Sequence, residues 1–130
     1  MKHLSRILIA LALMACASPA LAQSPPYVYP LTIGASSTSI LIANPQRKKL
    51  IFHNPNDSAK VAVCPVGPSR ASGGAAVTAA INGPGCVTLL PYDRMEVPGP
   101  TTGGAQLSMP SAWIGIASAG GSALTIWEFE

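Results

Sequence analysis

The residues of this chain that could do chemistry are few and lie far apart. His53, Asp57 and Asp93 are the natural acid–base candidates, but acid–base catalysis needs such groups beside a partner. Each aspartate lies in a segment typical of a turn, where Asp makes local hydrogen bonds. Serines are plentiful, yet no G-x-S-x-G motif marks one of them as a nucleophile. The sequence therefore marks no catalytic residue, and we expect a protein that is not an enzyme.

Two cysteines outside the N-terminal segment, Cys64 and Cys86, are predicted to form a disulfide. Their spacing is unlike a C-x-x-C redox motif, and one histidine in residues 23–130 is too few for a zinc site. An even pair in an oxidising compartment usually bridges. A loop of about 22 residues makes such a bridge worth roughly 3 kcal/mol on the chain-entropy model. Five scattered acidic residues do not provide a calcium site, so we expect no metal and no other cofactor.

The residues best suited to surface binding are Tyr92, Arg94 and Trp113. Tyr92-Asp93-Arg94 combines an aromatic plane with both signs of charge in one loop, and Trp113 begins a predicted strand. Aromatic rings beside polar groups are what sugar or peptide recognition uses. We therefore expect a shallow patch at one end of the domain that contacts a protein or a surface glycan. The alternative is a corner turn for Tyr92 and a core position for Trp113.

Residues 1–22 have the order of a bacterial-type secretory signal peptide. Lys2 and Arg6 precede an apolar run at 7–15 that is too short to span a bilayer, and Ala20 and Ala22 fit the signal peptidase pocket. We predict a signal peptide at 1–22, one mature domain at 23–130, and a periplasmic or secreted location without a membrane span. The alternative is a lipobox at 13–16, in which Cys16 would be lipidated and would anchor the domain.

The charge of residues 23–130 argues against nucleic-acid binding. Six cationic residues stand against five acidic ones, a net charge of +1, whereas nucleic-acid binding needs many Lys and Arg on one face. The one cationic cluster is Arg47-Lys48-Lys49. We interpret it as a solvated entrance to a strand, with an anion-binding patch as the alternative.

Glycine and proline predict an all-β domain, a single antiparallel β-sandwich or jelly roll. The chain holds 12 Gly and 13 Pro. In residues 23–130 most of them fall between short apolar runs, and together they interrupt every stretch long enough for an ordinary helix. β-branched residues alternate within the runs, as in strands. Ten segments are predicted, at 27–33, 39–43, 49–53, 60–64, 77–81, 86–90, 94–97, 106–109, 113–117 and 123–129.

Two turns in this pattern suggest hairpins. Residues 54–58 (NPNDS) combine a proline with Asn and Asp and should join 49–53 to 60–64. Residues 119–122 (AGGS) should likewise join 113–117 to 123–129. The last strand carries apolar residues on both faces, with Trp127 and Phe129 opposite Leu124 and Ile126. We expect a central strand whose two faces are buried in the core, the alternative for the aromatic face being an intersubunit contact.

Several of these segments together resemble small β modules of phage head and tail accessory proteins. The matching stretches are RKKLIFHN at 47–54, VAV at 61–63, VTLLP at 87–91, WIGIA at 113–117 and LTIWE at 124–128. The resemblance implies a sandwich with a structural or attachment role and no catalysis. The signal peptide and the disulfide depart from that family, which folds in the cytoplasm.

Overall fold

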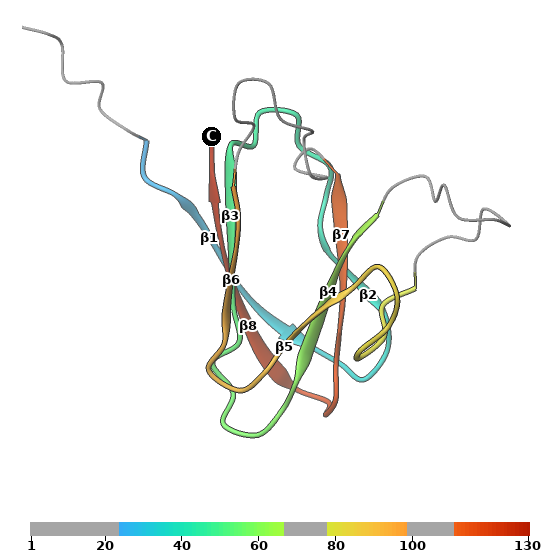
Figure 1. Ribbon diagram of the computed structural model, residues 1–130. Helices are drawn as coiled ribbons and strands as arrows, with labels where there is room; N and C mark the ends of the chain where they lie inside the picture. The colour runs from blue at the N-terminus through green and yellow to red at the C-terminus, as the bar shows by residue number, and fades with distance from the viewer. Residues whose placement is uncertain (1–23, 67–77, 99–110) are drawn as a thin grey trace, which may run out of the picture.

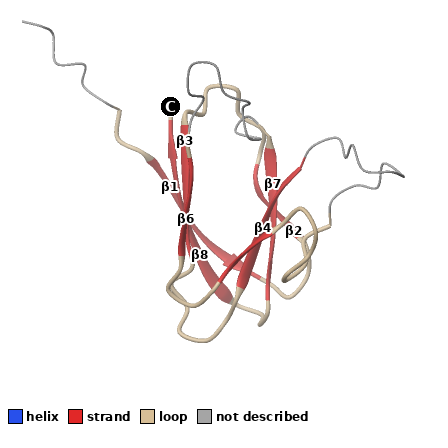
Figure 2. Cartoon of the chain, in the orientation of Figure 1, coloured by secondary structure: helices blue, strands red, loops and turns tan. Residues whose placement is uncertain are grey.

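The computed structural model describes residues 24–66, 78–98 and 111–130, which form eight strands and no helix (Figures 1 and 2). All pairs are antiparallel, in two four-stranded sheets, so the predicted all-β sandwich is confirmed. The strands are β1 (Tyr27–Ile33), β2 (Thr38–Leu41), β3 (Lys49–His53), β4 (Val61–Val66), β5 (Val87–Leu89), β6 (Arg94–Val97), β7 (Ala112–Ala117) and β8 (Ser122–Phe129).

The strand order is that of a jelly roll. The first sheet has the order β1-β8-β3-β6 and the second has the order β2-β7-β4-β5. Among the described strands β1 therefore lies beside β8, β2 beside β7, β3 beside β6 and β4 beside β5, as in one long ribbon folded back on itself and wound into two layers. Every connection except that of β4 to β5 crosses from one sheet to the other.

The core lies between the two sheets and follows from the alternation of side chains along the strands. β7 and β8 alternate buried with more exposed residues along their whole length, because successive side chains in a strand point to opposite faces. The buried cluster comprises Ile33, Ile40, Leu41, Leu50, Phe52, Val61, Val63, Leu89, Val97, Trp113, Ala117, Leu124 and Ile126.

Eight of the ten predicted strands are found, one is wrong in its described part, and one cannot be compared. The segments 27–33, 49–53 and 94–97 have the bounds of β1, β3 and β6, and five other predicted segments overlap the remaining strands. The prediction at 77–81 is wrong for its described part, since residues 78–81 are loop. The segment 106–109 lies outside the described residues.

The two predicted hairpins are wrong, because each turn connects strands of different sheets. β3 and β4 lie in opposite sheets, and so do β7 and β8. At the end of β3, the Asn54 amide donates to Asp93 O (2.9 Å), and after β7 the Ser118 amide donates to Lys60 O (2.8 Å). Each bond continues a ladder with a strand distant in sequence, so the turns are arches between the sheets.

Candidate functional site

The structure does not bring the predicted binding residues together. Trp113 is 3% exposed and packs in the core against Phe52, with ring centroids 4.8 Å apart. Arg94 lies on the outer face of the first sheet, paired with His53, so this sheet separates it from Trp113. Tyr92 is 68% exposed in the turn before β6, with φ at 60°. The core position that sequence offered as the alternative for Trp113 is the observed one.

A strip of apolar side chains crosses the outer face of the first sheet. Val28, Trp127 and Ile51 are successive partners on β1, β8 and β3, and Phe129 shares their face. Val28 is 52% exposed, Trp127 and Phe129 are half-buried, and Ile51 is buried. We call Val28, Ile51, Trp127 and Phe129 the aromatic strip. β8 is central as predicted, but the expected core burial of Trp127 and Phe129 is wrong.

Charged side chains border the aromatic strip on the β3 and β6 side. Lys49 Nζ lies 2.7 Å from Glu96 Oε1 and 5.5 Å from the centroid of the Phe129 ring. The Arg94 side chain is 60% exposed and its Nη2 lies 3.8 Å from Glu96 Oε2. A contact with Glu96 at that distance in solvent is worth little, so the Arg94 guanidinium remains accessible to a partner.

The acid–base candidates lie in ordinary turn and surface positions. The His53 ring lies beside Trp127 on the outer face, with centroids 6.1 Å apart. Asp57 Oδ1 accepts a hydrogen bond from Ser58 Oγ (3.1 Å), and Asp93 Oδ1 accepts one from the Arg94 amide (2.8 Å). Across residues 24–66, 78–98 and 111–130, no group of three or more His, Cys, Asp or Glu could hold a metal ion.

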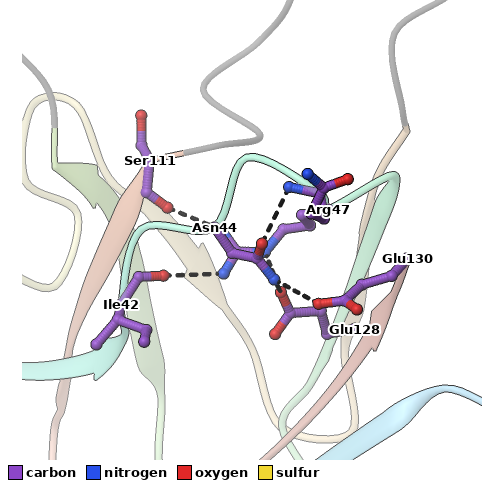
Figure 3. A network of polar contacts seen from close by, with 7 residues as sticks. Ile42, Asn44, Arg47, Ser111, Glu128 and Glu130 are labelled. Atoms are coloured by element: carbon purple, nitrogen blue, oxygen red, sulfur yellow. Dashed lines mark hydrogen bonds and ion pairs between the residues drawn. The ribbon is translucent and has the colours of Figure 1, made fainter.

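Arg47 is buried, so the interpretation of Arg47-Lys48-Lys49 as a solvated entrance to a strand is wrong for this residue. Its side chain is 1% exposed and the Glu128 side chain is 3% exposed. The Arg47 Nε lies 2.8 Å from Glu128 Oε1 (Figure 3). Nη1 donates to Ser111 O (2.8 Å) and Nη2 to Ile42 O (2.9 Å). The guanidinium thus ties the starts of β3 and β7 and the end of β2 to β8.

A hollow of about 390 Å³ beside this ion pair is lined in part by Tyr29, Asn44 and Glu128. Asn44 Nδ2 donates to Glu128 Oε1 and to Glu130 Oε1, both at 2.7 Å (Figure 3). Burial raises the pKa of Tyr29 above 10.0, and its hydrogen bond to the Glu128 carboxylate adds to the rise. Because these groups satisfy one another, we assign the network to the stability of the fold.

The predicted disulfide is present and lies on the outer face of the second sheet. Cys64 and Cys86 have Cα atoms 4.3 Å apart, close enough for a bridge. Val61 and Val63 point into the core, so Ala62 and Cys64 point outward, yet both are 0% exposed. Residues 78–86 contribute to their cover: Ala79 is 3% exposed and its amide donates to Ser37 Oγ (3.2 Å).

The sequence pattern contained the signal for the aromatic strip. Residues 123–129 carry apolar side chains on both faces, as do residues 49–53. In a two-layer sandwich one face of each strand points away from the core, so the second apolar face had to lie outside unless another element covered it. Val28 carried no such signal, because its place beside Trp127 follows from the pairing of β1 with β8.

Comparisons with known proteins yield no relative. No protein-family model matches the chain, and neither the curated proteins nor the solved structures contain a match. A search of the described residues for a helix able to cross a membrane likewise finds none.

Proposed function

We propose that this protein is a non-enzymatic interaction module that works outside the cytoplasm, and that the aromatic strip is its contact surface. The observation that carries the proposal is the run of Val28, Trp127 and Ile51 across three neighbouring strands, on a face that ordinarily carries polar side chains. Contiguous apolar surface with a polar border is the anatomy of a protein interface.

The charges around the aromatic strip favour a protein partner with an acidic edge. Lys49 and Arg94 lie on this face together with one carboxylate, Glu96, and that carboxylate already pairs with Lys49. A second copy of the chain would set cations against cations. A partner that supplies carboxylates around an apolar centre would be complementary, and Trp and Arg are the residues that dominate binding energy at such centres.

The test is position-specific photo-crosslinking in the producing cell. A photoreactive amino acid at position 28 should give a discrete polypeptide adduct, and one at Leu90, which is 53% exposed and outside the strip, should give none. Trp127→Ala should remove the adduct and weaken binding to the identified partner by about 30-fold, the effect of a 2 kcal/mol hot spot. Equal adducts at both positions, or an adduct that survives Trp127→Ala, would overturn the proposal.

Carbohydrate binding is the second candidate function, and one feature favours it. A hollow of about 220 Å³ on this face is lined by Ile51, Trp127, Phe129 and Arg94. Aromatic planes beside a hydrogen-bond donor suit the apolar face and the hydroxyl groups of a sugar ring. A glycan array separates the two candidates. If the protein binds particular glycans selectively and Trp127→Ala abolishes that binding, the ligand of the aromatic strip is a glycan and not a protein.

The extracytoplasmic location is part of the same proposal. It is supported by the signal-peptide pattern at 1–22. It is also supported by the disulfide between Cys64, in β4, and Cys86, the residue before β5. Disulfides persist in oxidising compartments and are rare in the cytosol.

A further inference from the structure

Two consecutive tight turns lie immediately before β5, in the loop that the disulfide ties to β4. The Gly83 amide donates to Ala80 O (3.0 Å), and the Cys86 amide donates to Gly83 O (3.2 Å). Asn82 has φ at 56° and Gly85 has φ at 79°, each at the third position of its turn, as a type II turn requires. The two turns share Gly83, so the geometry of one depends on the other.

The first turn contains Asn82-Gly83, which is the one Asn-Gly pair in the sequence. In a mobile backbone, the nitrogen of the residue after an asparagine attacks the side-chain amide carbon, and a following glycine hinders this attack least because it has no Cβ. A C–N bond forms and ammonia leaves. Water then opens the cyclic imide at either carbonyl to give aspartate or isoaspartate. Asn82 is exposed, so water has access to the imide at this position.

The folded turn opposes this reaction at the attacking nitrogen. The Gly83 amide must lose its proton to become a nucleophile, and that proton is held in the hydrogen bond to Ala80 O. The Asn82 amide donates to Thr88 Oγ1 (2.8 Å), so the peptide groups on both sides of Asn82 are anchored. A Cβ on Gly83 would lie 2.7 Å from Ala80 Cβ, which shows how closely the main chain is packed here.

We propose that Asn82 is a latent deamidation site, which the closed loop keeps unreactive and which opening of the loop releases. The disulfide holds the loop closed, because Cys86 ends the second turn and its partner Cys64 is 0% exposed in β4. Isoaspartate adds an atom to the main chain, so a loop that has reacted cannot re-form the original turn. The proposal concerns a different surface from the aromatic strip and does not depend on the proposed function.

The test compares the folded protein with the same protein unfolded in guanidinium chloride, at neutral pH and equal temperature. Proteolytic digestion and mass spectrometry measure the fraction of Asn82 that is converted to aspartate or isoaspartate. Conversion should be at least about tenfold slower in the folded protein, because an opening that costs about 1.4 kcal/mol leaves only about a tenth of the molecules open. Equal rates would overturn the protection by the loop, and an unfolded protein that keeps Asn82 intact would overturn the site.

Two variants test what holds the loop closed. Cys64→Ala with Cys86→Ala should raise the conversion rate at least about tenfold in protein that circular dichroism shows to be folded. Thr88→Val removes the acceptor of the Asn82 amide but keeps the disulfide, and should raise the rate roughly two- to tenfold.

Thr32→Val, at an exposed position of β1, is the matched control and should leave the conversion rate unchanged. A folded double cysteine variant that converts no faster than the wild type would overturn the role of the disulfide. If the double variant does not fold, Thr88→Val decides: a rate no higher than that of Thr32→Val would overturn the role of the turn.

Discussion

Asn54 is a fully buried polar side chain at the end of β3, and it organises the arch between the sheets. Its Nδ2 donates to Ala59 O (2.8 Å), Leu89 O (3.1 Å) and Leu90 O (2.9 Å). Asn54→Ala would remove this donor from the buried carbonyls of Ala59 and Leu89, whereas Leu90 O would keep a hydrogen bond from the Asp93 amide. We expect the free energy of unfolding to fall by roughly 2–4 kcal/mol, measured by urea denaturation.

Two variants at the same arch test the cause. Asn54→Asp keeps the shape but removes the amide donors, so it should destabilise at least as strongly at neutral pH. Ser58→Ala removes only an exposed contact with Asp57 and should change stability by less than about 0.5 kcal/mol. A loss for Asn54→Ala as small as that for Ser58→Ala would show that the arch does not depend on this side chain.

Tyr29 should make stability depend on pH in the alkaline range. Its pKa is raised above 10.0 by burial and by its hydrogen bond to Glu128, so the folded state holds the phenolic proton more tightly than the unfolded state. The resulting stabilisation is complete below pH 10 and is lost as the pH rises through the folded-state pKa. Urea denaturation across this range should show a steeper decline for the wild type than for Tyr29→Phe. Parallel declines would contradict the assignment.

At the scale of the strands, local pattern predicts where strands form but not which strands pair. The bounds of β3 and β6 follow from runs of apolar and β-branched residues between turns. Residues 54–58 and 119–122 have turn chemistry that suits a hairpin and an arch equally. Strands distant in sequence decide between the hairpin and the arch. β8 pairs with β1 and β3, where Leu124 and Ile126 are buried in the core, and the residues near the turn do not indicate this pairing.

The same limit explains the candidate site. Arg47 was judged by its neighbours Lys48 and Lys49, but its buried partner Glu128 lies at the other end of the chain. The sequence shows Trp113 only as an aromatic residue at the start of a predicted strand, whereas the register of β7 with β4 turns it into the core. Strand prediction therefore succeeded where it depended on neighbours, and site prediction failed where contacts join residues far apart in sequence.

The disulfide acts at the scale of the second sheet, because it ties residues 78–86 against β4. Replacing both residues, Cys64→Ala with Cys86→Ala, should lower the free energy of unfolding by about 2–5 kcal/mol. Ser37→Ala removes a hydrogen bond to Ala79 in the same loop and should cost only about 1 kcal/mol. Chemical denaturation compares the variants. Two titratable thiols in the natively purified protein would contradict the bridge.

For the molecule as a whole, the jelly roll begins just after the predicted cleavage site. β1 starts at Tyr27 and pairs along its length with β8, while Ser24 and Pro25 are exposed. Removal of residues 1–22 would therefore leave every described strand intact. The first sheet would keep β1 as its edge strand, with Pro30 in the middle of it, a residue that blunts an edge against further pairing.

We therefore expect the mature protein in the extracytoplasmic fraction to begin at Gln23, as measured by intact mass and N-terminal sequencing. Ala22→Leu should block cleavage, because signal peptidase requires a small residue there, and should leave a precursor that retains residues 1–22. Cys16→Ala should not affect processing. If Cys16→Ala abolishes processing and the wild type carries lipid at Cys16, the protein is membrane-anchored instead. An intact Met1 in a soluble cytoplasmic form would contradict export altogether, and with it an extracytoplasmic partner for the aromatic strip.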